Sequence, residues 1–137
     1  MTTIALVVSE FNAEITENML SHARATAKKN NITIAKIIRV PGAYDAPLAV
    51  KKLLKMREVR AVAVLGAIIT GETKHDELIA GALANALSSL SLEFEKPVTL
   101  GVIGPGATYA MAKARAKGYA GRAVTGASKM AGEVQKI

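Results

Sequence analysis

Residues 61–80 read AVAVLGAIITGETKHDELIA and join the pattern of a buried strand to that of a helix. The run from Ala61 to Ile69 is apolar throughout, whereas the turn after it is polar and leads into a helix pattern. Such a junction places backbone N–H groups and the positive end of a helix dipole beside a concave site. The turn also carries His75, whose side chain moves protons near neutral pH. The stretch therefore indicates chemistry on an anionic substrate that needs proton transfer.

Strand patterns and helix patterns alternate along the rest of the chain. The other strands are expected at residues 4–8, 32–40 and 98–103, and the helices at 16–30, 46–56, 76–90 and beyond 103. In the first helix, the spacing of Ile15, Met19, Ala23 and Ala27 predicts one apolar stripe. Asp45 is placed to cap the second helix, and the last helix is expected to break near Gly118. Continuous apolar strands between helices are typical of a parallel sheet covered on both faces. We therefore predict an α/β fold: one domain over residues 1–137 with a doubly wound, parallel, four-stranded sheet.

The composition narrows the classes of function. The chain of 137 residues has a formal net charge of +7, two histidines and no cysteine. The lack of cysteine excludes disulfides and thiolate catalysis and fits a reducing compartment, so we expect a cytoplasmic protein. No zinc site, membrane span or signal peptide is predicted. The basic residues are dispersed and aromatic residues are few, which favours a solvated surface that attracts small anions over nucleic-acid binding.

The third helix has almost no charge where a helix on a sheet should face water. Its stretch from Leu78 to Leu92, LIAGALANALSSLSL, has no polar side chains except Asn85 and three serines. A helix of this kind is normally buried all round. We therefore expect its outer face to be covered by neighbouring subunits of a homo-oligomer.

Four candidate functional segments follow the four predicted strands. They are SEFN at 9–12, PGAYD at 41–45, the stretch 66–75, and GPG at 104–106. Ligands of open parallel sheets bind at the carboxyl ends of the strands, so these segments should meet there or at a subunit boundary. Phe11 and Tyr44 either stack on a planar ring or simply pack their loops. The GPG segment either presents its backbone to a ligand or forms a turn.

Two ionisable residues are candidates for chemistry. His75 alone would fit a helix cap, but with Gly71, Glu72 and Thr73 immediately before it we favour catalysis. Arg115 would be an ordinary surface charge unless the chain folds it back over the crevice. In that position its planar guanidinium would clamp a phosphate group.

Together these segments resemble lumazine synthase, the riboflavin-biosynthesis family that makes 6,7-dimethyl-8-ribityllumazine. The similarity covers nearly the whole chain, and its short form is similar to the archaeal branch. It rests on FN at 11–12, VPGAYDAPLAVKKL at 40–53, LGAIITGETKHDELIA at 65–80 and KPVTLGVIG at 96–104.

The resemblance implies a transferase with a flavodoxin-like three-layer sandwich and no cofactor or metal. It would condense 5-amino-6-(D-ribitylamino)uracil with 3,4-dihydroxy-2-butanone 4-phosphate to give the lumazine, phosphate and water. Phe11 would stack on the uracil ring, His75 would carry protons, and Arg115 would pair with the phosphate. The resemblance further implies that Ala43, Tyr44 and Asp45 hold the ribityl chain, that Ala67, Ile68 and Ile69 line the ring pocket, and that Glu72 and Thr73 offer backbone N–H groups to the phosphate. Asn12, Gly42, Gly71 and Leu100 are the other implied substrate-binding residues.

The resemblance also implies a pentamer whose sites lie between adjacent subunits, with the third helix at the five-fold axis. Pentamers of the family stay alone, pair, or close into an icosahedral capsid of sixty subunits. This chain starts at once with its first strand, so no N-terminal arm is expected. Asp45 stands where glutamate is common, and Leu100 where a phenylalanine packs on the ring across the interface. The connection after Arg115 is shortened to AKGYAG.

Three other interpretations stay open. An archaeal-type riboflavin synthase would use lumazine itself, although the turn GETKHD argues against it. A non-catalytic flavodoxin-like domain would bind nucleotides or nucleic acid without needing His75. A scaffold would assemble without activity.

Overall fold

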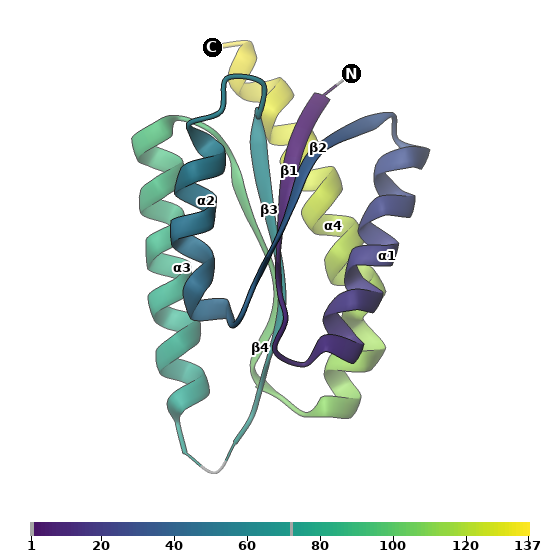
Figure 1. The fold of residues 1–137 in the computed structure, drawn as a ribbon, viewed down its shortest axis with the longest axis vertical. Coiled ribbons are helices and arrows are strands. Elements are labelled where there is room, and N and C mark those ends of the chain that lie inside the picture. Colours follow the sequence, from purple (N-terminus) through teal and green to yellow (C-terminus); the bar gives the residue numbers. More distant parts are fainter. Residues whose placement is uncertain (1, 72) are drawn as a thin grey trace.

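In the computed structural model, which describes residues 2–71 and 73–137, four parallel strands form one sheet between two pairs of helices (Figure 1). The strands are β1 (Thr2–Ser9), β2 (Ile32–Val40), β3 (Ala61–Ile69) and β4 (Val98–Ala107), in the order β2-β1-β3-β4. The helices are α1 (Ala13–Lys29), α2 (Ala46–Leu54), α3 (His75–Phe94) and α4 (Tyr109–Gln135), and a 3-10 turn, η1 (Ala43–Asp45), precedes α2. The predicted doubly wound α/β sandwich is confirmed.

The two central strands, β1 and β3, are buried on both faces. In β1 every residue from Ile4 to Ser9 is buried, and in β3 every residue from Ala61 to Ile68. Helices α1 and α4 cover one face of the sheet, while α2 and α3 cover the other (Figure 1). This double cover explains why both strands are continuous apolar runs rather than alternating ones.

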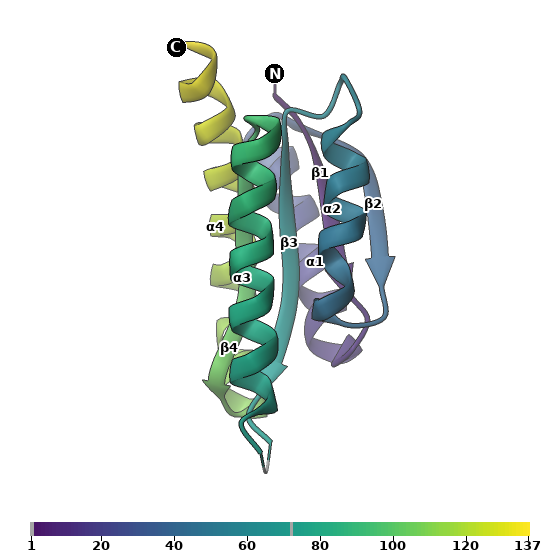
Figure 2. The ribbon, with the colours of Figure 1, turned by 90° about the vertical axis from the view of Figure 1, so that its left-hand side faces the viewer.

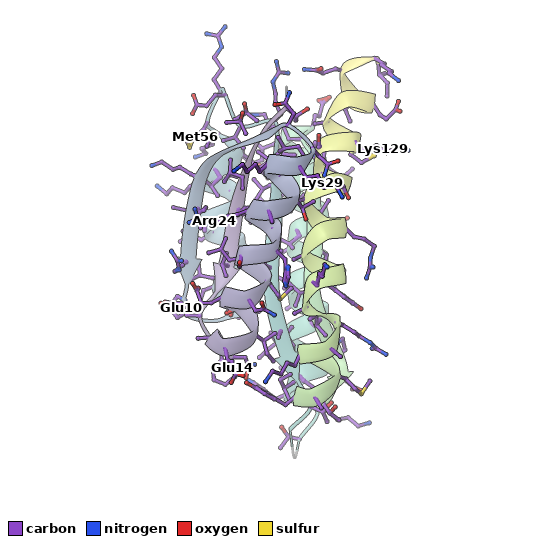
Figure 3. The ribbon with its side chains drawn as sticks, turned by 90° about the vertical axis from the view of Figure 1, so that its right-hand side faces the viewer. Glu10, Glu14, Arg24, Lys29, Met56 and Lys129 are labelled. Atoms are coloured by element: carbon purple, nitrogen blue, oxygen red, sulfur yellow. The ribbon has the colours of Figure 1, made fainter. Side chains whose placement is uncertain are left out.

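Helix α1 buries the stripe that its sequence predicts. That stripe consists of Ile15, Met19, Ala23 and Ala27. Glu14 lies in the first turn and Lys28 and Lys29 in the last, an arrangement that favours the helix dipole. Figure 3 shows the α1 and α4 layer, with Glu14 at the carboxyl ends of the strands and Lys29 at the opposite end.

Helix α4 is continuous, so the predicted break near Gly118 was wrong. A Cβ atom added at Gly118 would lie 3.1 Å from Nη1 of Arg122, whose side chain covers this turn of the helix. Arg122 also lies over the ring of Tyr119, with 5.2 Å between the guanidinium carbon and the ring centroid. The glycine therefore sits inside a regular helix whose side chains pack over it.

The Gly-Pro-Gly segment belongs to β4 and is not a free turn. The N–H of Thr70, just after β3, donates to the carbonyl of Ala107 at 2.9 Å, which extends the pairing of β3 with β4 beyond this segment. Gly104 has φ +100° and approaches the carbonyl of Ile68 so closely that no side chain would fit. The segment therefore continues the strand beside the end of β3.

Helix α3 keeps an apolar outer surface in the single chain. Figure 2 shows it beside α2, extending along the sheet. Of its 20 residues only Leu83 and Leu87 are buried, whereas Leu78 and Leu92 are 68% and 77% exposed. The exposed leucines therefore form an uncovered apolar surface on this side of the sheet.

No helix in the described part of the chain is long and apolar enough to cross a membrane.

Helix α4 packs closely on β4 because both contact surfaces are made of small residues. Its buried face consists of one valine, Val124, and a row of alanines: Ala112, Ala116, Ala120, Ala123, Ala127 and Ala131. A Cβ atom added at Gly101 would lie 2.7 Å from Cβ of Ala123 and 2.9 Å from the carbonyl oxygen of Val64. Neither atom can move without shifting a helix or a strand.

We expect Gly101→Ala to lower the free energy of unfolding by about 1–3 kcal/mol, because the added methyl group overpacks this contact. Gly132→Ala is the matched control, because Gly132 lies in α4 with no atom within 4 Å of its would-be Cβ. That substitution should raise the stability by about 0.5–1 kcal/mol. Thermal unfolding of both variants measures the difference, and equal melting temperatures would contradict the close contact at Gly101.

Candidate active site

A cavity of about 250 Å³ lies at the carboxyl ends of β1 and β3. The chain winds from β1 to β2 on one side of the sheet and from β3 to β4 on the other, so the cavity lies at the topological switch point. Ligands of this architecture bind at that point. The structure brings ten predicted site residues together around the cavity: Phe11, Gly42, Ala43, Tyr44, Ala67, Ile68, Ile69, Gly71, Thr73 and His75.

The cavity has an apolar floor and two aromatic side chains at its rim. The floor comes from the end of β3, where Ala67 and Ile68 are buried. Phe11, after β1, and Tyr44, in η1, are 71% and 68% exposed. A planar ring entering here would meet an apolar surface below and an aromatic face beside it.

The turn that carries Phe11 is fixed to both neighbouring strands. Asn12 adopts the left-handed conformation with φ 63°, and its Nδ2 donates to the carbonyl of Ala67 at 2.9 Å. The N–H of Phe11 donates to the carbonyl of Pro41 at 3.0 Å. Asn12 does not line the cavity, and its side-chain amide acts on β3 instead. The turn is therefore held ready at the rim.

The segment after β2 is held by its own acid. The carboxylate of Asp45 accepts a hydrogen bond from the N–H of Gly42 at 3.0 Å. Asp45 occupies the predicted N-cap position of α2, but its side chain makes no cap bond to that helix. Asp45 borders an adjoining hollow rather than the cavity itself, together with Tyr44 and Leu48. The bond instead bends the chain so that Ala43 and Tyr44 face the end of β3.

The turn after β3 presents His75 as the first residue of α3. Its side chain is exposed at the cavity, and its backbone N–H donates to Oγ1 of Thr73 at 3.3 Å. The carboxylate of Asp76 accepts from the N–H of Gly106 at 3.2 Å and so connects α3 to the end of β4. Glu72 lies outside the described residues. His75 is thus placed at the rim with its ring free to approach a ligand.

A cluster of polar side chains connects the starts of α1 and α4. The carboxylate of Glu14 accepts from the Lys113 ammonium at 2.9 Å and from the Tyr109 hydroxyl at 2.7 Å. These hydrogen bonds, of which the one from Lys113 has the larger effect, hold the pKa of Glu14 below its ordinary value and raise the pKa values of Lys113 and Tyr109.

Within the part of the chain that the structure describes, no group of three or more His, Asp or Glu side chains is placed to hold a metal ion.

Two predicted residues lie away from the cavity of the same chain. Leu100, in β4, is 48% exposed and borders a hollow beside α3 with Ser88 and Leu92. Arg115 is exposed on α4 and does not line the cavity. A single chain therefore offers a ring-sized pocket with His75 but without the arginine.

Three cavity residues were not predicted as site residues. They are Ser9, which lies in the candidate segment 9–12, Asp76 and Ile79. Helix geometry contains the signal for Ile79, because it follows His75 by four residues and therefore lies on the same face of α3. Asp76 carried no signal of its own, since its contact to Gly106 depends on the fold.

Known proteins resemble this chain over nearly its whole length. A family model described as 6,7-dimethyl-8-ribityllumazine synthase matches residues 1–135. The chain belongs to this family. It is 48% identical to the 6,7-dimethyl-8-ribityllumazine synthase of Metallosphaera sedula, over 98% of this chain and 89% of that one. The proteins of the same name from Saccharolobus solfataricus and Sulfolobus acidocaldarius are 48% and 46% identical to this chain. Both alignments include 98% of this chain, and they include 87% and 85% of the two relatives, respectively. The predicted family is thus confirmed.

Substitutions of Asn12 should separate its hydrogen bond from its backbone conformation. Asn12→Gly loses the bond to Ala67 but keeps the left-handed turn, so we expect a loss of about 1 kcal/mol in the free energy of unfolding. Asn12→Ala adds the strain of that conformation and should lose roughly a further 1 kcal/mol. Thermal unfolding ranks the three proteins, and an alanine variant as stable as the wild type would exclude this role for Asn12.

Proposed function

We propose that the cavity at the ends of β1 and β3 is where this member of the lumazine synthase family forms 6,7-dimethyl-8-ribityllumazine. The substrates are 5-amino-6-(D-ribitylamino)uracil and 3,4-dihydroxy-2-butanone 4-phosphate. The observation that carries the proposal is the coincidence of the family motifs with the cavity. The segments PGAYD and GAIITGETKHD meet there although twenty residues separate them in the chain.

Each side of the cavity suits one part of the substrates. The pyrimidine ring would lie on Ala67 and Ile68 with Phe11 against its face. Backbone groups of Gly42 and Ala43 and the side chains of Tyr44 and Asp45 would hold the ribityl chain. The other proposed contacts are those of Ile69, Gly71, Glu72 and Thr73, while Asn12 would act indirectly by holding the turn that carries Phe11.

The phosphate would need a cation that one chain does not bring to its own cavity. Backbone N–H groups of the turn before α3 lie at a helix N-terminus, which favours an anion. We assign the clamp to Arg115 of a neighbouring subunit, with Leu100 of that subunit against the ring. The uncovered apolar surface of α3, including Leu78 and Leu92, supports such an assembly. The proposal extends to a pentamer, alone or as part of a capsid, in the cytoplasm, where a chain without cysteine needs no oxidising compartment.

The reaction itself requires proximity and proton transfer. The amine of the uracil attacks the ketone, water leaves to give an imine, phosphate is eliminated, and the ribitylamino nitrogen closes the ring with loss of a second water. Holding the two substrates in attack geometry supplies much of the acceleration. His75 would take and return protons during imine formation and phosphate loss. Arg115 would stabilise the charge on the departing phosphate.

The direct test mixes the purified protein with both substrates and follows lumazine formation by absorbance against the uncatalysed reaction. We expect saturable acceleration that depends on both substrates. A folded, oligomeric protein without acceleration would contradict the proposal and favour a scaffold.

His75→Ala should lower kcat by about 100-fold, because it removes proton transfer but leaves positioning intact. His22→Ala is the control, since His22 lies on α1 away from the cavity and its loss should leave kcat unchanged. Steady-state rates decide the matter, and two histidine variants with equal rates would exclude His75 as the proton carrier.

Arg115→Ala should raise the KM for the phosphorylated ketone by about tenfold or more, because a charged hydrogen bond to phosphate is lost. The KM for the uracil substrate should change little. Arg122→Ala is the control for the loss of one surface charge, because Arg122 is also exposed and lies seven residues further along α4. An unchanged KM for the ketone in Arg115→Ala would remove this residue from the site.

A further inference from the structure

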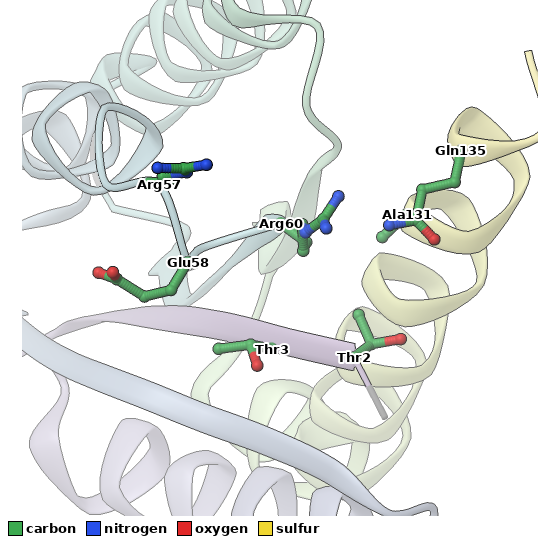
Figure 4. Close-up of a pocket in the computed structure, with 7 residues that line it drawn as sticks. All are labelled: Thr2, Thr3, Arg57, Glu58, Arg60, Ala131 and Gln135. Carbon is green, nitrogen blue, oxygen red and sulfur yellow. The ribbon is translucent and has the colours of Figure 1, made fainter.

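A second cavity, of about 490 Å³, opens at the opposite end of the sheet from His75 (Figure 4). It lies at the amino ends of β1 and β3, against the last turns of α4. Its polar groups are the hydroxyls of Thr2 and Thr3, the guanidinium groups of Arg57 and Arg60, the carboxylate of Glu58 and the amide of Gln135. The proposed reaction makes no use of any of them.

The two arginines of this cavity make no ion pair with an acidic side chain in the described part of the chain. Figure 4 shows the side chain of Arg60 extending toward Gln135 and the guanidinium of Arg57 lying on the same side of the connection, whereas Glu58 points the other way. Two unpaired like charges at one cavity repel each other, and a bound anion would relieve that repulsion.

A third cation adds to the positive potential of this end. Nζ of Lys96 donates to the carbonyls of Leu54 and Met56 at 2.9 and 3.0 Å, at the end of α2. Burial lowers the pKa of Lys96, and the charge of Arg60 lowers it further. Because the ammonium is already bonded to these carbonyls, direct contacts with a ligand fall to the two arginines.

The position of Arg60 is set by the strands. Its N–H donates to the carbonyl of Thr3 at 2.9 Å, and the preceding Val59 is fully buried. The N–H of Val59 donates to the carbonyl of Met56 at 3.1 Å, which closes the turn that carries Arg57. The backbone of both arginines is therefore held before any ligand arrives, and this reduces the entropy lost on binding.

We infer that this cavity binds a small phosphate monoester of a polyol, with the phosphate on Arg57 and Arg60. Planar guanidinium groups match phosphate oxygens through paired hydrogen bonds. The cavity volume of about 490 Å³ leaves room for more than a phosphate group. The amide of Gln135 and the hydroxyl of Thr2 provide donors and acceptors for the hydroxyl groups of the remainder.

Isothermal titration calorimetry tests this site with ribose 5-phosphate as the probe. All proteins carry Arg115→Gln, so that the proposed active-site clamp does not contribute. Adding Arg57→Gln and Arg60→Gln should weaken binding by about tenfold or more, because two charged hydrogen-bonding groups are lost. The matched control adds Arg24→Gln and Lys36→Gln, which remove the same charge from α1 and β2 outside the cavity. The control should change the affinity by less than about twofold.

Four results would overturn the inference. They are no binding, equal affinity with and without Arg57 and Arg60, an equal loss in the matched control, which would indicate only general attraction of anions, and equal affinity for inorganic phosphate and for the ester. The same titrations are repeated with inorganic phosphate and with ribose in place of ribose 5-phosphate. Weaker binding of both than of the ester supports recognition of the whole molecule. In the protein that keeps Arg115, the double substitution Arg57→Gln and Arg60→Gln should leave the oligomer size and the rate of lumazine formation unchanged.

Discussion

The parallel pairing of β1 with β3 is the constraint on which the rest of the molecule depends. Both strands are buried on both faces, so neither can slip by one residue without misplacing every side chain. Their register, with Val8 opposite Leu65, brings Ser9 beside Gly66, where a Cβ atom would lie 3.4 Å from that of Ser9. The turn after β1 then meets the last residues of β3, and the bond from Asn12 to Ala67 completes this contact. The cavity therefore lies where the pairing of these two strands brings their ends and the following segments together.

The features that could be predicted from the sequence are those that local patterns determine. Apolar runs predicted the central strands, and the helical spacing of Ile15, Met19 and Ala23 predicted the buried face of α1. The gathering of site segments was predictable too, because the carboxyl ends of parallel strands meet at one edge. His75 and Phe11 line the same cavity for that reason alone, although their roles in the reaction remain proposals.

The features that escaped prediction depend on contacts between distant segments. Gly118 looked like a helix break, yet α4 passes through it, because Ala116 and Ala120 on either side of this glycine are both buried in the core. The Gly-Pro-Gly segment looked like a turn, but the bond from Thr70 to Ala107 makes it part of the sheet. Asp45 looked like a helix cap, and its carboxylate bonds instead to Gly42. Local propensity is a weak guide wherever a tertiary partner offers a better contact.

The incompleteness of the cavity in one chain has a physical consequence. The pocket has an apolar floor and His75 but no arginine of its own, while Leu100 and Arg115 are exposed on other surfaces. In the proposed pentamer the uncovered leucines of α3 would be buried, and the same contact would carry the arginine to the neighbour's pocket. Burying apolar surface is worth about 25 cal/mol per Å², so assembly would be driven by surface that has no part in the chemistry. Catalysis and association would then depend on one another, because a separated chain would bind the ring but would lack the group that receives the phosphate charge.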